Sequence, residues 1–175
     1  MIAETVGHDT AAGLIRPLAA GDREPLRSVL VETGVFSAEE VEIALELIDI
    51  VLTRPDQEDY VIHVHEADGR VNGYYCVGPT PATAGTYDLY WIAVDPSAQG
   101  TGIGQQLNRH AEEYIRGQDG SLIIVETSSR ESYEGTRRFY AKQHYLELAR
   151  IRDYYRRGDD LVVYGKYLNK ISKGG

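Results

Sequence analysis

The spacing of the apolar positions changes several times along the chain, and each change predicts a new element. Apolar residues recur at helical spacing in residues 41–52 and 103–115, whereas residues 122–125 form the continuous apolar run of a strand covered on both faces. The predicted strands are residues 14–18, 60–66, 70–77, 88–94, 122–125, 145–155 and 161–168. The predicted helices are residues 22–34, 37–54, 103–116 and a segment from 128 to beyond 140.

Polar residues at the borders of these segments predict where helices begin. Asp22 is the predicted N-cap of the first helix. Ser37 with Glu40, and Ser128 with Glu131, have the spacing of a capping box, in which two side chains satisfy the free N–H groups of a first turn. We therefore expect the second and fourth helices to begin at Ser37 and Ser128.

The resulting order is β-α-α-β-β-β-α-β-α-β-β. Asp68-Gly69 between two alternating segments predicts a hairpin, and residues 157–160 join the last two strands. Mixed runs of strands and helices predict an α/β (α+β) fold with a mixed, mainly antiparallel central sheet flanked by helices. We expect one domain over residues 1–175, with residues 1–13 and 169–175 as loose tails.

Composition narrows the classes of partner. The formal net charge of −9 disfavours nucleic acid and anionic membranes and favours a cationic substrate, although an acidic balance also simply aids solubility. The single cysteine, Cys76, excludes an internal disulfide, and no secretory signal is visible, so we expect a cytoplasmic protein. His63 and His65 share a strand face without a visible third ligand, so we predict no metal site.

A strand, a short glycine loop and a helix follow one another in residues 87–115. Such a loop directs free backbone N–H groups and the positive end of a helix at whatever lies above it, which suits a phosphate. Gly100 and Gly102 are followed by neither the third glycine of a dinucleotide motif nor the Lys-Ser/Thr pair of a Walker loop. Taken alone, these glycines fit a tight turn without a ligand better than a phosphate site, because turns are the main use of glycine.

The wider pattern resembles the GNAT superfamily of acyl-coenzyme A N-acyltransferases. The residues that carry the resemblance are Val94-Asp95-Pro96, then Gln99-Gly100-Thr101-Gly102-Ile103-Gly104, and Phe139-Tyr140 near the end of the next helix. The order of elements agrees along nearly the whole chain. Two positions differ from the family pattern: Tyr133 stands where an asparagine is common, and His144-Tyr145 stands where Gly-Phe is common.

The resemblance implies acetyl-coenzyme A as acyl donor. Its pyrophosphate would lie on the backbone N–H groups of Gln99, Gly100, Thr101, Gly102, Ile103 and Gly104. Ile92 and Val94 would pair with the pantetheine arm as an added strand does, and Tyr133 and Phe139 are the remaining predicted contacts.

The resemblance also implies two proton transfers. Tyr140 matches the general acid that protonates the leaving thiolate, and its alternative role is that of a core aromatic residue. The base that takes a proton from the amine is Asp88 or Glu126; either can equally be a strand-end acid facing solvent. Tyr154-Tyr155, the 156–160 loop and helix 41–52 lie where the family shapes the acceptor pocket.

The expected activity is therefore transfer of an acetyl group to a primary amine of a small molecule or peptide. The identity of the amine, the length of the acyl group and a homodimer are left open. The alternative is a non-catalytic domain that binds acyl-coenzyme A as a sensor or scaffold.

Overall fold

The computed structural model describes residues 13–168 and has the predicted fold class, a mixed α/β sheet flanked by helices. Its strands are β1 (Leu14–Pro17), β2 (Val61–Ala67), β3 (Arg70–Pro79), β4 (Thr86–Val94), β5 (Leu122–Ser128), β6 (Leu146–Arg156) and β7 (Asp159–Tyr167). Its α-helices are α1 (Arg23–Glu32), α2 (Ala38–Thr53), α3 (Ile103–Gly117) and α4 (Glu134–Lys142). None of the helices within residues 13–168 is long and apolar enough to cross a membrane. The predicted tails, apart from Gly13, lie outside the described residues.

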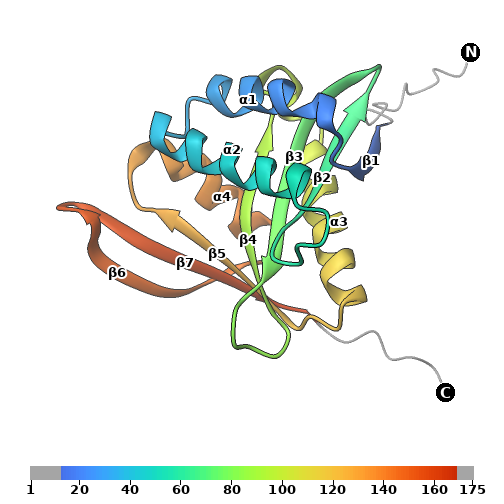
Figure 1. Cartoon of the computed structure of the whole chain (residues 1–175). Coiled ribbons are helices and arrows are strands. Elements are labelled where there is room, and N and C mark those ends of the chain that lie inside the picture. Colours follow the sequence, from blue (N-terminus) through green and yellow to red (C-terminus); the bar gives the residue numbers. More distant parts are fainter. Residues whose placement is uncertain (1–12, 169–175) are drawn as a thin grey trace, which may run out of the picture.

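The seven strands form one sheet in the order β1-β2-β3-β4-β5-β7-β6 (Figure 1). All neighbours are antiparallel except β4 and β5, which are parallel. The parallel pairing runs only from Thr86 opposite Leu122 to Asp88 opposite Ile124. Beyond that point β4 and β5 diverge, so the sheet opens into a gap near its centre, and the β6–β7 hairpin extends away from the body of the molecule (Figure 1).

β4 also carries a bulge at the start of this gap. Its register with β3 places Trp91 opposite Cys76 and Leu89 opposite Val77, so Tyr90 is an extra residue without a partner. A bulge bends its strand and increases the local twist, and this bulge begins where β4 leaves β5.

Two apolar cores cover the two faces of the sheet. The alternation of side chains along β3 sends Tyr74 and Cys76 into the core beneath α1 and α2, and Tyr75 and Val77 into the core beneath α3. The sheet is therefore buried on both sides at β3, and Figure 1 shows α1 and α2 together on one face.

Several predicted termini are confirmed. The Ser37 hydroxyl accepts a hydrogen bond from Glu40 N at 3.2 Å, and the Glu40 carboxylate accepts one from Ser37 N at 2.7 Å, which completes the capping box of α2. Asp68 and Gly69 both have positive φ, as a tight hairpin turn requires. His144 follows the end of α4 and lies in the left-handed region with φ of 65°. It therefore adopts the conformation that a glycine usually adopts after a helix.

Three local predictions were wrong. Ser128 does not cap a helix: β5 continues to Ser128, whose hydroxyl donates to the Asp159 carboxylate, and helical structure starts only with a 3₁₀ turn at Glu131–Tyr133. Asp22 does not cap α1, because its carboxylate is taken by the guanidinium of Arg16, a stronger partner than an N–H group. The turn between β6 and β7 is shorter than predicted, since β7 begins at Asp159.

Candidate active site

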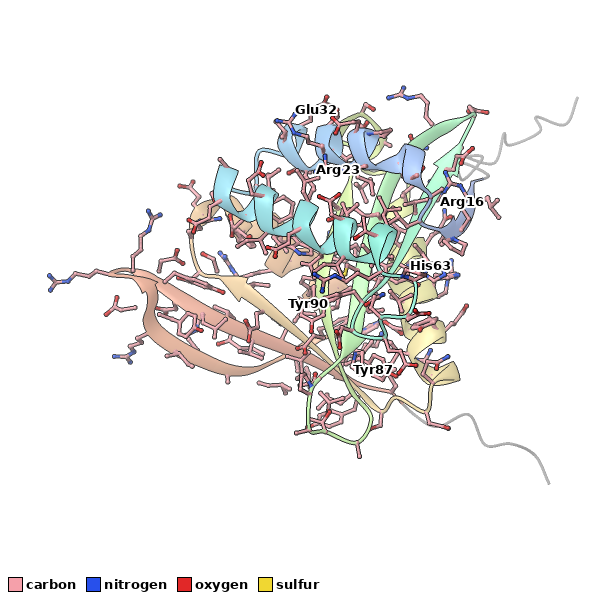
Figure 2. The ribbon with its side chains drawn as sticks, viewed as in Figure 1. Arg16, Arg23, Glu32, His63, Tyr87 and Tyr90 are labelled. Carbon is pink, nitrogen blue, oxygen red and sulfur yellow. The ribbon has the colours of Figure 1, made fainter. Side chains whose placement is uncertain are left out.

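The gap between β4 and β5 opens into a cavity of about 790 Å³. β4 and β5 supply its floor, and the first turn of α2 with its preceding loop supplies one wall. The segment before α4 and the end of β6 form the rest of the cavity lining. The aromatic and charged lining residues are Phe36, Glu39, Glu40, Asp88, Tyr90, Trp91, Glu126, Arg130, Tyr133, Tyr140, Tyr155, Arg156 and Asp159. Tyr90, the bulged residue, lies beneath α2 in the view of Figure 2.

The glycine loop follows β4 directly. Gly100 and Gly102 have φ of 76° and 89°, a conformation that side chains with a β-carbon rarely adopt. Asp95 shapes the entry to the loop by accepting from Ser97 N at 2.8 Å, and Thr101 Oγ1 donates to Ala98 O at 2.5 Å. Hydrogen bonds from side chains of the loop itself therefore stabilise its conformation, and its outer surface stays open.

The N–H groups at the start of α3 are free. Within residues 13–168, the first backbone N–H of this region to donate a hydrogen bond is that of Gln106, to Gly102 O, and those of residues 100–105 donate none. No acidic side chain lies in the first turn of α3. An anion placed here would meet several donors and the positive end of the helix, without repulsion from that turn.

Tyr140 reaches the cavity from α4. Its side chain is only 3% exposed and packs edge-on against the rings of Phe139 and Tyr145, at centroid distances of 5.4 and 5.2 Å. Within residues 13–168 its hydroxyl makes no hydrogen bond, and it is not one of the fully buried unpaired polar atoms, so it reaches the open cavity. Burial raises the pKa of Tyr140 above its ordinary value, so the phenol holds its proton at neutral pH.

Asp88 and Glu126 line the same cavity from the two diverging strands. One carboxylate oxygen of Asp88 accepts a hydrogen bond from Thr80 Oγ1 at 2.7 Å. The pKa of Glu126 is raised, first by desolvation against the cavity walls and second by the negative charge of Asp88. The Glu126 side chain still opens to solvent through the cavity, so it can exchange a proton with a bound molecule.

Comparison with known proteins agrees with this arrangement. The acetyltransferase (GNAT) domain family matches residues 58–147. A crystal structure of a protein from Desulfovibrio desulfuricans assigned to the GNAT family superimposes with a TM-score of 0.84 at 38% identity, covering 89% of this chain and 99% of that one. The chain belongs to the GNAT acetyltransferase family.

More distant GNAT structures share the fold. The ribosomal-protein-S18-alanine N-acetyltransferase from Escherichia coli has a TM-score of 0.72 at 15% identity, covering 93% of this chain and 98% of its own. The PaiA N-acetyltransferase from Thermoplasma acidophilum, solved with coenzyme A, has a TM-score of 0.68 at 19% identity, covering 90% and 99%. No curated protein matches the chain.

The residues predicted to bind the donor lie along one path of the GNAT fold, from β4 through the glycine loop. Ile92 and Val94 are on the stretch of β4 that no longer pairs with β5. A β-carbon at Gly104 would lie 3.2 Å from the ring of Phe139, so Phe139 packs directly against the first turn of α3. The fold therefore places these residues next to one another.

Tyr133 lies in the same cavity, and its hydroxyl already has a partner. It donates to Glu40 at 2.8 Å, and Arg130 donates to the other oxygen of Glu40 at 2.6 Å. Although burial would raise it, the pKa of Glu40 is held below its usual range by hydrogen bonds from the Ser37 N–H, Tyr133 and Arg130. Glu40, which also caps α2, therefore fastens the start of α2 to the segment before α4.

Sequence reasoning missed several lining residues. Phe36, Tyr90 and Trp91 had no motif to mark them, although the large number of tyrosines was a weak signal. Of the two β6 tyrosines singled out, Tyr155 lines the cavity and Tyr154 does not. Helix 41–52 contributes only Ile43, because the wall is built by its first turn and the residues before it.

The histidines lie apart from this site. His63 Nδ1 and His110 Nδ1 both lie within hydrogen-bond distance of the Tyr75 hydroxyl, at 3.1 and 2.8 Å, in the core beneath α3. Desolvation and the neighbouring His110 lower the pKa of His63 to about 4. Among the residues 13–168, no cluster of three or more His, Cys, Asp or Glu side chains is arranged to hold a metal ion.

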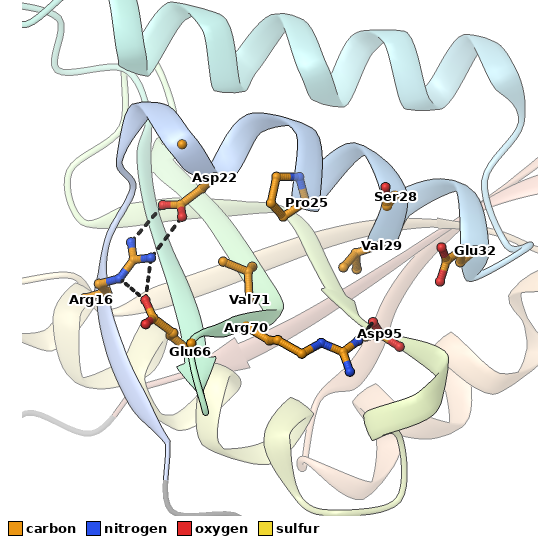
Figure 3. Close-up of a pocket in the computed structure, with 12 residues that line it drawn as sticks. Arg16, Asp22, Pro25, Ser28, Val29, Glu32, Glu66, Arg70, Val71 and Asp95 are labelled. Atoms are coloured by element: carbon orange, nitrogen blue, oxygen red, sulfur yellow. Dashed lines mark hydrogen bonds and ion pairs between the residues drawn. The ribbon is translucent and has the colours of Figure 1, made fainter.

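A second, smaller cavity of about 380 Å³ lies between α1 and the β2–β3 hairpin (Figure 3). Arg16 crosses one end and pairs with Asp22 at 2.7 Å and Glu66 at 2.6 Å. Arg70 pairs with Asp95 at the other end, at 3.6 Å. None of the residues predicted for catalysis or donor binding lines this cavity.

Proposed function

We propose that this protein transfers the acetyl group of acetyl-coenzyme A to a primary amine of a small molecule or peptide. The observation that carries the proposal is the gap between β4 and β5. There β4 leads from a cavity lined by the phenol of Tyr140 and two carboxylates into a loop of free N–H groups. GNAT membership and relatives solved with coenzyme A support the choice of donor.

The loop and the edge of β4 fit the donor. At Gly100 and Gly102 a β-carbon would meet no atom within 4 Å, so the space above the loop is free for a pyrophosphate. The N–H groups of residues 100–104 would hold that anion, whereas that of Gln99 already donates to Pro96 O. The backbone of Ile92 and Val94 would align the pantetheine arm, and Phe139 would pack beside the loop. The bound donor supplies an activated thioester acyl group.

Two side chains move the protons. An alkylamine with a pKa of about 10 is protonated at neutral pH and cannot attack until it loses that proton. Glu126 accepts it, because its raised pKa makes it a better base than an ordinary surface carboxylate. Asp88 lies beside it as the second candidate. Tyr140 donates its phenolic proton to the departing sulfur, for which its raised pKa keeps it protonated beforehand.

The test is release of free coenzyme A thiol from acetyl-coenzyme A in the presence of an amine panel. The panel contains alkylamines, polyamines, amino acids and N-terminal peptides, and coenzyme A affinity is measured separately by calorimetry. We expect thiol release that depends on at least one amine. Tight coenzyme A binding without turnover on any amine would instead favour the non-catalytic acyl-coenzyme A-binding domain.

A further inference from the structure

Some of the charged residues that line the large cavity pair with a residue of opposite charge, and others do not. Of the two arginines in its wall, Arg130 pairs with Glu40 at 2.6 Å, whereas Arg156 is largely exposed and only approaches Asp159 at 3.8 Å. These two arginines are outnumbered by the acidic lining residues, Glu39, Glu40, Asp88, Glu126 and Asp159.

Three lining carboxylates have no cationic partner within residues 13–168. Asp88 and Glu126 lie at the strand gap, where the only side-chain hydrogen bond is the one from Thr80 to Asp88. Glu39 lies on the wall formed by the first turn of α2 and makes no salt bridge there. The cavity thus carries uncompensated negative charge on two different walls.

Aromatic rings lie between these walls. Phe36 and Trp91 meet edge to face at a centroid distance of 5.1 Å, and Tyr90 and Tyr155 also line the space. The faces of such rings attract alkylammonium groups, and their surface accepts the methylene groups of an aliphatic chain. This lining suits a flexible cation better than a sugar or a carboxylate.

Together these features point to the class of acceptor, and this inference rests on the acetyltransferase activity proposed above. We propose that the acceptor is an aliphatic diamine or longer polyamine that carries a positive charge at each end and no carboxylate. One amine lies at Glu126 and Asp88, facing the Tyr140 hydroxyl, which makes no hydrogen bond in the described part of the chain. The second ammonium lies towards Glu39, with the aliphatic chain against the aromatic residues.

A matched series of acceptors tests this placement. 1,5-Diaminopentane, pentylamine and 5-aminopentanoate share an amine on four methylene groups and differ at the far end, which is an ammoniomethyl, methyl or carboxylate group. The value for the symmetric diamine is halved, because it has two equivalent amines. We expect kcat/KM to fall in that order, by about 2- to 5-fold at each step, since a partly exposed charge pair contributes less than about 1 kcal/mol. Equal values, or a preference for the carboxylate, would overturn the proposal.

Charge reversal at Glu39 locates the second ammonium. We expect Glu39→Lys to lower kcat/KM about 10-fold for 1,5-diaminopentane and less than about 2-fold for pentylamine. Glu42→Lys is the matched control, because Glu42 is exposed on the same helix but does not line the cavity. A diamine preference that survives Glu39→Lys intact would also overturn the proposal.

The two levels of the argument fail differently. If acetyl-coenzyme A is turned over with amines outside the diamine class and the matched series shows no preference for the diamine, only the inferred acceptor is wrong. If no amine in the broad panel releases thiol, the acetyltransferase proposal fails and the acceptor proposal fails with it.

Discussion

The polar side chains that line the two cavities of this protein differ in whether they have hydrogen-bond or ion-pair partners. In the small cavity the buried carboxylate of Asp22 is saturated, with hydrogen bonds from Arg16 and from Ala19 N at 2.7 Å (Figure 3). In the large cavity the Tyr140 hydroxyl makes no hydrogen bond within the described residues, and Asp88 and Glu126, which line the same cavity, have no cationic partner there. Both cavities contain arginine and acidic residues, so composition alone does not distinguish them.

The difference indicates which cavity serves chemistry. A carboxylate whose oxygens already accept hydrogen bonds is part of the scaffold, whereas side chains that reach an open cavity without a partner are available to a ligand. The small cavity uses its charges to fasten β1 to the segment before α1 and to β2. The large cavity leaves groups available for a substrate. The following substitutions test this difference between the two cavities.

The largest effect is expected at Tyr140. Tyr140→Phe keeps the ring in its aromatic cluster and removes only the proton donor, so we expect kcat to fall by about 100-fold or more. Coenzyme A affinity should change by less than about 2-fold, because the hydroxyl is not among the groups that hold the pyrophosphate. Tyr164→Phe is the control, since Tyr164 stacks on Tyr140 at 6.4 Å without lining the cavity. Unchanged turnover in Tyr140→Phe would contradict its role as acid.

The next effect concerns the base. Glu126→Gln should lower kcat/KM about 10- to 100-fold at neutral pH. Because the base must be deprotonated, wild-type kcat/KM should fall as the pH decreases through the raised pKa of Glu126. Asp88→Asn removes the neighbouring negative charge, so the acid limb of the pH profile should move to lower pH. If Asp88→Asn abolishes activity and Glu126→Gln does not, Asp88 is the base.

In the small cavity the expected effect is on stability alone. Asp22→Ala leaves Arg16 without its main partner and Ala19 N without an acceptor, which should lower the free energy of unfolding by about 2–3 kcal/mol. Arg16 holds the pKa of Asp22 below its usual range, so this contribution is present above about pH 4 and is lost as the pH falls further.

Glu32→Ala, at the rim of the same cavity, is the control and should change stability by less than about 0.5 kcal/mol. Urea titration gives both values. A loss of kcat in folded Asp22→Ala would contradict the division between the two cavities.

The smallest effect is expected at a third polar group, which lies in neither cavity. The Tyr74 hydroxyl is buried in the core beneath α1 and α2 and has no hydrogen-bond partner in the described structure. Tyr74→Phe removes a desolvated, unpaired group and should raise the free energy of unfolding by about 1 kcal/mol without affecting turnover. Thermal unfolding measures it, and a lower Tm would show that this hydroxyl has a stabilising contact.

Much of the fold could be predicted because its signals are local. The capping box of α2, the Asp68-Gly69 hairpin and the strand–glycine loop–helix unit each depend on residues within a few positions of one another. The cap predicted at Ser128 failed because the competing partner, Asp159, is 31 residues away in the sequence. Local patterns predict an element well until a distant residue offers a stronger interaction.

The candidate site divides in the same way. Spacing and periodicity in the sequence predicted the order of elements, and the resemblance to the GNAT family suggested the donor loop and Tyr140. Only the tertiary structure decided which acids stay uncompensated. Arg130 and Tyr133 reach Glu40 across 90 and 93 residues, and the gap depends on where β4 leaves β5. The charges of the large cavity depend on such long-range pairings, since charges compensate one another through space and not along the chain.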